Sequence, residues 1–288
     1  MAAQTRIRLA TAIVLALAAS GCSKAKSSAD AAQAQRYLAG GAIPDSAAIL
    51  PPPPAANSEA LARDVALRSV ALGLRGTPRY ALAVADADRS EASTVNAFQC
   101  AFGTVISPKH APALSRLLAK VRLDVRASAY KAKGYYNRPR PWVAAHGQVC
   151  RSSEALVRSD GSYPSARGAV GWAYALVLSE VNPSRRDALL RRGREFGESR
   201  VVCDAEWQSD VEAGYILATA AVSRMQQSQL FLTDLAAARK ELSEMLRSGQ
   251  RAPLDCALED RARGGDRGFA AQVAASSQDK KAPAAGEP

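Results

Sequence analysis

Residues 161–183 read GSYPSARGAVGWAYALVLSEVNP, and the second half of this stretch has the periodicity of a helix. Four apolar side chains recur every three or four residues and would share one helix face: Val170, Tyr174, Val177 and Val181. Asn182-Pro183 ends the pattern, because proline cannot continue a helix. The sequence therefore predicts a helix that begins near Gly168, directly after a polar turn, and ends before Asn182.

Helical periodicity continues on both sides of this stretch. Before it, one predicted helix carries Leu61, Val65 and Val70, and another carries Leu114, Leu117, Leu118, Val121 and Val125. After it, apolar residues at helical spacing mark three more helices: Leu189, Leu190 and Phe196; Val211, Tyr215 and Val222; and Leu232, Leu235, Leu242, Met245 and Leu246. Because no run of alternating β-branched residues interrupts them, we predict an all-α domain.

The two ends of the chain differ from this helical region. Arg6 and Arg8 precede a short apolar run, and small residues then lead to Cys22. This pattern resembles a bacterial lipoprotein signal in which Cys22 becomes the lipidated N-terminus, with an ordinary secretory peptide as the alternative. We expect a leader over residues 1–22, a flexible tether over 23–36, the helical domain over 37–250 and a disordered tail over 251–288. The protein would then be exported and held in the periplasm by lipid at the outer membrane.

Cysteine content and charge limit the kinds of site. Four cysteines follow Cys22, and an exported chain meets an oxidising compartment, so we expect two disulfides with three pairings open among Cys100, Cys150, Cys203 and Cys256. With two histidines, His110 and His146, and no CxxC pair, we expect no metal and no cofactor. The formal net charge of +11 suits an anionic ligand, while the motifs of nucleic-acid-binding modules are absent from the sequence.

Three short segments place phosphate-binding residue types at predicted helix ends. They are KGYYNRPRP at 133–141, GSYPSAR at 161–167 and SRVVCDAEWQSD at 199–210. A serine at a helix N-terminus offers its hydroxyl and backbone N–H groups to an anion. Arginine adds a guanidinium that matches phosphate oxygens. Together the segments predict a phosphate-binding site.

In this order the segments resemble the three-part signature of the type 2 phosphatidic acid phosphatase and vanadium haloperoxidase superfamily: KX6RP, PSGH and SRX5HX3D. The matching residues are Lys133, Arg140, Pro141, Pro164, Ser165, Ser199, Arg200 and Asp210. LPPPPA at 50–55, NAFQCAFG at 96–103 and GWAYALVLSEVNP at 171–183 look like the class A bacterial nonspecific acid phosphatases in particular. The resemblance covers about residues 37–247 and implies a compact multi-helix bundle of the acid phosphatase type.

The first element of the signature fits in two registers. Lys131 with Arg138-Pro139 has the same spacing as Lys133 with Arg140-Pro141. The aromatic Trp142 after the second pair favours Lys133 and Arg140.

The resemblance also implies the role of each residue. Phosphate would be held by Lys133, Arg140, Ser165 and Arg200. Where the family has a general-acid histidine this chain has Arg167, and where the family has its nucleophilic histidine, which Asp210 would orient, it has Glu206. Arginine, with a pKa above ~12, cannot donate a proton near neutrality, and a carboxylate repels a phosphate dianion. We therefore expect phosphomonoesterase activity to be lost or greatly weakened.

The replacements leave several hypotheses open. Arg167 and Glu206 would either pair across the site and block it, or leave a net cationic pocket. The main hypothesis is a pseudoenzyme that binds phosphate, another small anion or a partner. One alternative is a repurposed hydrolase, such as a glycoside hydrolase, that uses Glu206 with Asp204 or Asp210. Another is a residual acid phosphatase acting on phosphomonoesters. A homo-oligomer also stays open.

Overall fold

The computed structural model describes residues 36–152, 159–249 and 254–264. In these ranges the chain folds into helices joined by loops, with no β-strand, so the predicted all-α class is confirmed. None of the helices in the described ranges is long and apolar enough to cross a membrane. The predicted leader, Cys22, the tether up to residue 35 and the tail beyond residue 264 lie outside the described residues.

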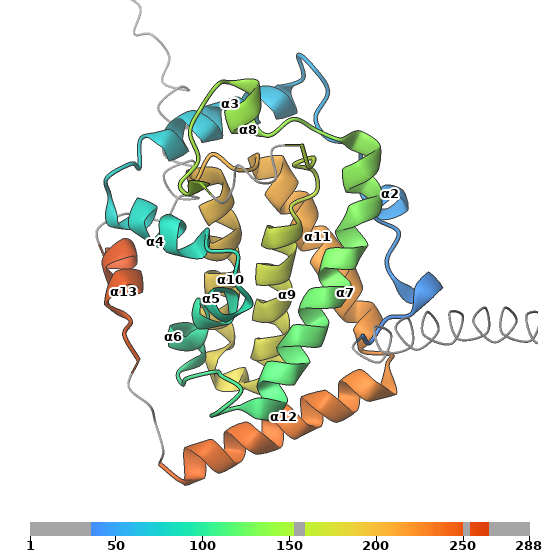
Figure 1. Cartoon of the computed structure of the whole chain (residues 1–288), viewed down its shortest axis with the longest axis vertical. Coiled ribbons are helices and arrows are strands. Elements are labelled where there is room, and N and C mark those ends of the chain that lie inside the picture. The colour runs from blue at the N-terminus through green and yellow to red at the C-terminus, as the bar shows by residue number, and fades with distance from the viewer. Residues whose placement is uncertain (1–35, 153–158, 250–253, 265–288) are drawn as a thin grey trace, which may run out of the picture.

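Helix α9 (Ala166–Val181) forms the centre of the molecule. It packs against α7 (Pro112–Tyr136), α10 (Arg186–Val202) and α11 (Gln208–Met225), which surround it in Figure 1. All four apolar residues that define its predicted face are buried in the main core. Close approach of α10 depends on Gly171, because a Cβ there would lie 2.4 Å from the Phe196 ring.

The remaining helices cover the ends and sides of this bundle. Helix α12 (Gln229–Arg247) crosses one end of α7 and α9, and α3 (Glu59–Leu72) with the short α8 (Pro141–Ala144) lies at the other end (Figure 1). The other short elements are η1 (Gly40–Ala42), α2 (Ser46–Ile49), α4 (Pro78–Asp86), α5 (Glu91–Asn96), α6 (Gln99–Phe102), η3 (Pro183–Arg185) and α13 (Ala257–Gly264).

The predicted helix around Leu61, Val65 and Val70 is α3, but Val65 does not face the core. Val65 is 52% exposed, whereas Asp64, Leu67 and Ala71 are buried. Asp64 lies inside because its carboxylate accepts hydrogen bonds from Arg138 at 2.8 Å and from the Ser209 backbone at 2.9 Å. The polar partners of a buried aspartate therefore set the rotation of this helix.

Two disulfides close the fold. Cys100 pairs with Cys256 and Cys150 pairs with Cys203, which selects one of the three open pairings. Within the stretch expected to be a tail, residues 257–264 form α13 directly after Cys256. Its Arg263 donates to Glu195 of α10 at 3.0 Å, so the helix is fixed by an ion pair as well as by the adjacent Cys256.

Candidate functional site

The three polar segments meet where α7 ends and α9 begins. Lys133 lies in the last turn of α7, Arg140 directly precedes α8, and Ser165 is the N-cap of α9. Arg200 lies near the end of α10, and Glu206 lies in the loop that leads to α11. The chain thus brings together five residues that are spread over more than seventy positions in sequence.

The carboxylate of Glu206 lies among the side chains that the signature assigns to phosphate. It accepts a hydrogen bond from Ser165 Oγ at 2.5 Å, and its oxygens lie 3.4 Å from Arg140 Nη1 and 3.3 Å from Arg200 Nε. The residue is 3% exposed. A buried carboxylate on the molecule's own chain therefore has the contacts that a bound anion would make with these residues.

Ser165 has two roles at this position. Its Oγ accepts a hydrogen bond from Gly168 N at 2.8 Å, which caps α9, and donates to Glu206. The N-terminus of α9 then contributes the positive end of the helix dipole near the carboxylate. Glycine at position 214 of α11 is also required, because a Cβ there would lie 2.6 Å from the Ser165 carbonyl oxygen.

Electrostatics keep Glu206 ionised. Burial alone would raise its pKa, but Arg200, Arg140, Lys133 and the Ser165 hydrogen bond together hold the pKa below its usual value. Lys133 is buried as well, and burial lowers its pKa despite the attraction of Glu206. Its Nζ donates to the carbonyl oxygens of Gly161 at 2.5 Å and Ser162 at 3.3 Å. The anion and its cations therefore stabilise one another's charged forms.

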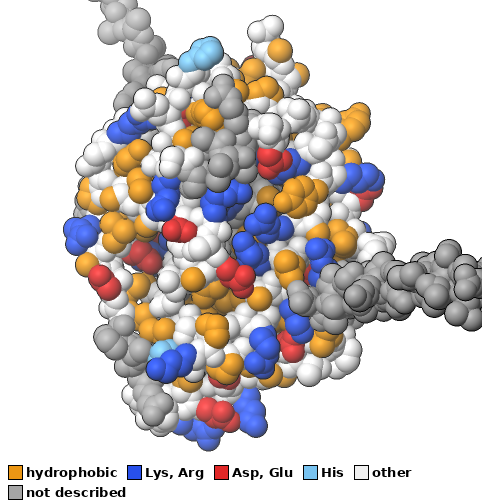
Figure 2. All heavy atoms as spheres, in the orientation of Figure 1, with side chains coloured by type: hydrophobic (Ala, Val, Ile, Leu, Met, Phe, Trp, Pro, Cys, Tyr) orange, Lys and Arg blue, Asp and Glu red, His pale blue; other side chains and the backbone are white. Residues whose placement is uncertain are grey.

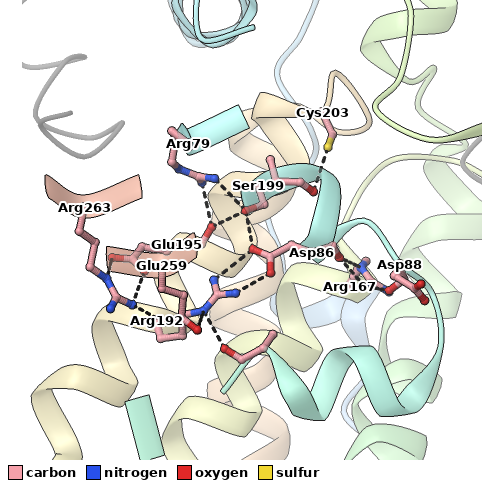
Figure 3. A network of polar contacts seen from close by, with 12 residues as sticks. Arg79, Asp86, Asp88, Arg167, Arg192, Glu195, Ser199, Cys203, Glu259 and Arg263 are labelled. Carbon is pink, nitrogen blue, oxygen red and sulfur yellow. Dashed lines mark hydrogen bonds and ion pairs between the residues drawn. The ribbon is translucent and has the colours of Figure 1, made fainter. Parts of the chain in front are cut away.

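Arg167 does not close over Glu206. Its guanidinium donates to the backbone carbonyl oxygens of Asp86 and Asp88 and lies 5.2 Å from the centre of the Phe196 ring, as Figure 3 shows for the two carbonyls. The ion-pair partners of Glu206 in the described structure are Arg140 and Arg200. Of the two arrangements that the sequence left open, the structure has the one without an Arg167–Glu206 bridge.

A buried polar network fixes the segment that receives Arg167. Asp86, at the end of α4, binds Arg192 at 2.5 Å and accepts from Ser199 Oγ at 2.7 Å, while Arg79 donates to the same hydroxyl at 3.0 Å (Figure 3). Ser199 is thus a structural link between α4 and α10 in this protein. Because Asp86 also offers its carbonyl to Arg167, the network sets the direction of that side chain.

Asp210 faces a partner of its own. Its carboxylate accepts from Arg138 Nη1 at 2.6 Å and from the Trp207 backbone N–H at 2.8 Å, which caps α11. Burial raises the pKa of Asp210 to about 6, although Arg138 and the Trp207 N–H oppose the shift. Arg138 also binds Asp64 and Ser209, so this arginine of the second register joins α3 to the start of α11.

The residues of the two possible registers of the first signature element lie in different places. Lys133 and Arg140 are buried beside Glu206, whereas the Lys131 side chain is 65% exposed and pairs with Asp45. The three carboxylates suggested as pairs have different partners: Glu206 lines the pocket described below, while Asp204 is bound by Arg68 at 2.6 Å and Asp210 by Arg138. His110 and His146 are both exposed.

A pocket opens above Glu206, with a volume of about 60 Å³. Its described lining contains seven cationic and two anionic side chains: Arg89, Arg122, Arg126, Lys133, Arg140, Arg167 and Arg200 against Asp160 and Glu206. Basic side chains also gather near the centre of the face shown in Figure 2. The expected net cationic pocket is therefore present in the structure, with more arginines than the motifs supplied.

Sequence reasoning missed Arg89, Arg122, Arg126 and Tyr130 as pocket residues. Three of them share a signal that the sequence does contain. Positions 122, 126 and 130 are four residues apart, and position 133 follows three residues later, so all four lie along one face of α7. Extending the motif lysine backward at helical spacing would have found them.

Comparison with known proteins agrees with this architecture. The PAP2 superfamily matches residues 114–232, which include most of α7 and all of α9, α10 and α11. The chain is 39% identical over 211 residues to the non-specific acid phosphatase of Providencia stuartii, covering 73% of this chain and 85% of that protein. The chain belongs to the non-specific acid phosphatase family.

Two further relatives carry similar names. An acid phosphatase of Zymomonas mobilis is 37% identical over 218 residues, covering 74% of this chain and 82% of the relative. A non-specific acid phosphatase of Salmonella typhimurium is 39% identical over 197 residues, covering 68% and 79%. In this acid phosphatase family member, Glu206 and Arg167 both line the cationic pocket.

Proposed function

We propose that this acid phosphatase family protein binds phosphate or a phosphate ester in the pocket above Glu206, with phosphomonoester hydrolysis lost or greatly weakened. The excess of seven cationic over two anionic described lining residues supports anion binding. The contacts of Glu206 support the second part of the proposal, that hydrolysis is lost or greatly weakened, and they are the observation on which the proposal depends. Its carboxylate competes with an incoming phosphate for Ser165, Arg140 and Arg200.

The residues available for proton transfer support the same conclusion. Arg167 stays protonated near neutrality and its guanidinium is directed to the carbonyls of Asp86 and Asp88. Neither exposed histidine is among the described residues that line the pocket. A phosphate ester held here would have no histidine among the described lining residues to protonate its leaving oxygen.

A residual acid phosphatase is the second candidate, and similarity favours it over the first. The relatives from Providencia stuartii, Zymomonas mobilis and Salmonella typhimurium are all named acid phosphatases. Since the pKa of Glu206 is lowered, its carboxylate is ionised and is the group that would attack phosphorus. As the ester P–O bond breaks, the alcohol would leave, taking its proton from water, and an acyl phosphate would remain on Glu206. A second water would then hydrolyse the acyl phosphate to release phosphate and regenerate the carboxylate.

Replacement of Glu206 by glutamine separates the two candidates. We expect the native protein to show very low turnover of p-nitrophenyl phosphate, and Glu206→Gln to bind orthophosphate at least about tenfold more tightly in calorimetry, because a negative charge leaves the pocket. Glu212→Gln, at an exposed carboxylate of α11, is the matched control and should leave affinity unchanged. Substantial native turnover that Glu206→Gln abolishes would establish the second candidate instead.

Restoring both histidines tests whether the phosphate-binding residues still work. In Arg167→His with Glu206→His, the competing carboxylate is removed and two imidazoles take the positions that the resemblance assigns to histidine. We expect p-nitrophenyl phosphate turnover to rise well above that of the native protein. Tight orthophosphate binding without any gain in turnover would show that the surrounding residues, too, no longer support catalysis.

We also propose that the chain is exported and carries lipid on Cys22. The apolar run followed by small residues and Cys22 supports this, as do two disulfides, which favour an oxidising compartment. Metabolic labelling with a palmitate analogue should mark the native protein and not Cys22→Ser. Equal labelling of both would exclude this lipidation site.

A further inference from the structure

The outer part of the pocket contains arginines that the phosphatase signature does not use. Arg122 and Arg126 come from the middle of α7, and Arg89 comes from the loop between α4 and α5. All three side chains are half-buried. Like charges four residues apart on a helix destabilise it by some tenths of a kcal/mol, so Arg122 and Arg126 are not explained by the stability of α7.

Arg122 and Arg126 make weak contacts within the described part of the chain. Arg122 lies 3.4 Å from Glu91, whose side chain is 48% exposed, and Arg126 donates to the hydroxyl of Tyr130 at 3.3 Å. An exposed ion pair of this length contributes little to stability. Both arginines can therefore turn toward a stronger acceptor at small cost.

The inner part of the pocket has a different balance of charge. There Glu206 is shared between Arg140 and Arg200, and Asp160 lies 3.6 Å from Arg140, so the two carboxylates of the described lining offset part of the inner positive charge. The described lining adds three more cations, Arg89, Arg122 and Arg126, and no further carboxylate. Along α7 the Cα atoms of Arg126 and Lys133 are separated by about 10 Å, seven residues at ~1.5 Å each, and their side chains line the same pocket.

We propose that Arg89, Arg122 and Arg126 form an outer anion subsite that binds the second phosphate of a ligand with two or more linked phosphates. This inference rests on the proposed anion-binding function and names its ligand class: an organic or inorganic diphosphate rather than a simple monoester. One phosphate faces the inner residues around Glu206, and the next contacts the guanidinium groups of the outer subsite. Tyr130, which is 51% exposed and lines the pocket, borders this subsite.

Calorimetry with two anions tests the subsite in the full-length protein. Orthophosphate reports the inner site, and methylenediphosphonate reports both because its P–C–P link resists hydrolysis. We expect the native protein to bind the diphosphonate at least about tenfold more tightly than orthophosphate. Arg122→Gln with Arg126→Gln should remove most of this preference while keeping the melting temperature near the native value.

The control variant has the same change of charge elsewhere. Arg186→Gln with Arg191→Gln alters two exposed arginines of α10 and should keep the native preference. Equal affinity of the native protein for the two anions would overturn the subsite even if orthophosphate binds well. A preference that both double variants lose equally would also overturn it, by assigning the effect to net charge. Failure of both anions to bind would remove the proposed function as well.

Discussion

At the residue scale, Glu206 and Asp210 are two fully buried carboxylates with opposite pKa shifts. Burial raises the pKa of both, but Glu206 has Arg200, Arg140 and Lys133 around it, so its pKa ends below the usual value. Asp210 has Arg138 as its main cation and is repelled by Glu206, and its pKa rises to about 6. The number of cations around each carboxylate decides the direction of the shift.

The shift of Asp210 predicts a measurable pH dependence. The folded state keeps the proton on Asp210 up to about pH 6, whereas the unfolded state loses it near the ordinary value of 3.8. This group therefore makes folding less favourable as pH rises through that window. Asp210→Asn removes this contribution. The unfolding free energy of the native protein, relative to that of the variant, should therefore fall as pH rises from about 4 to about 6. Urea denaturation across this range measures it, and a constant difference would contradict the raised pKa.

Glu206 contributes to the pH dependence of stability with the opposite sign. Because its folded pKa lies below the unfolded one, its contribution to stability is present above the unfolded pKa and is lost as pH falls through the folded value. The contributions of the two carboxylates to the pH dependence of stability thus partly cancel in the native protein. Measuring Asp210→Asn separates them, since Glu206 titrates in both forms.

The sequence predicted best which individual residues make up the site. The positions of Lys133, Arg140, Ser165, Arg200 and Glu206 followed from motif spacing, and they do meet in space. The direction of Arg167 did not follow, because it depends on the carbonyl groups of Asp86 and Asp88, which no motif contains. Acceptors on a distant loop are set by tertiary structure alone.

At the element scale, the loop between α10 and α11 owes its position to α3 and α8. Arg68 of α3 holds the buried Asp204 carboxylate with two hydrogen bonds of 2.6 and 2.8 Å. The Trp142 N–H of α8 donates to the Asp204 carbonyl at 3.3 Å. Asp204 has a φ of +57°, which a non-glycine residue adopts at some cost. These contacts offset that cost and place Glu206 two residues later.

Loss of the Arg68 contact should therefore be severe. Arg68→Ala leaves Asp204 buried without its cation, which we expect to lower the unfolding free energy by about 3 kcal/mol and to weaken orthophosphate binding. Arg63→Ala is the matched control on the same helix, because its pair with Glu212 is 3.5 Å long and largely exposed. That change should cost less than about 1 kcal/mol in urea denaturation. Equal effects of the two substitutions would contradict the role given to Arg68.

Helix positions were predictable where the core is apolar and less so where it is polar. The central helix was expected from near Gly168 to before Asn182, and α9 spans Ala166–Val181. It begins earlier because Ser165 itself is the cap. The rotation of α3 was missed since its buried Asp64 reads as a surface residue in sequence. Arg122 and Arg126 were not singled out, because no motif contains them.

At the scale of the whole molecule, the two disulfides act on different parts of the fold. Cys100–Cys256 joins residues 156 positions apart and fixes α13 against the side of the bundle. Cys150–Cys203 joins residues 53 positions apart, and Cys203 directly precedes Asp204. The first links distant parts of the chain, and the second holds the loop that carries Glu206.

Removing each disulfide should therefore give different results. Cys100→Ser with Cys256→Ser should lower the unfolding free energy by about 2–5 kcal/mol and leave orthophosphate affinity unchanged. Cys150→Ser with Cys203→Ser should lower stability by a similar amount and also weaken orthophosphate binding at least about tenfold. Thermal unfolding and calorimetry on the two variants measure both quantities. Equal loss of affinity in the two variants would show that the site depends on global stability alone.

The carboxylate of Glu206 also competes with any anion that would bind Ser165 and Arg200. Because it is attached to the chain, its effective concentration beside Ser165 and Arg200 is fixed and is not lowered by dilution. A free anion must displace it, and the apparent affinity is reduced by the fraction of molecules in which the carboxylate is already bound. Under the proposed function, free phosphate would therefore bind more weakly than a phosphate ligand that makes additional contacts in the pocket.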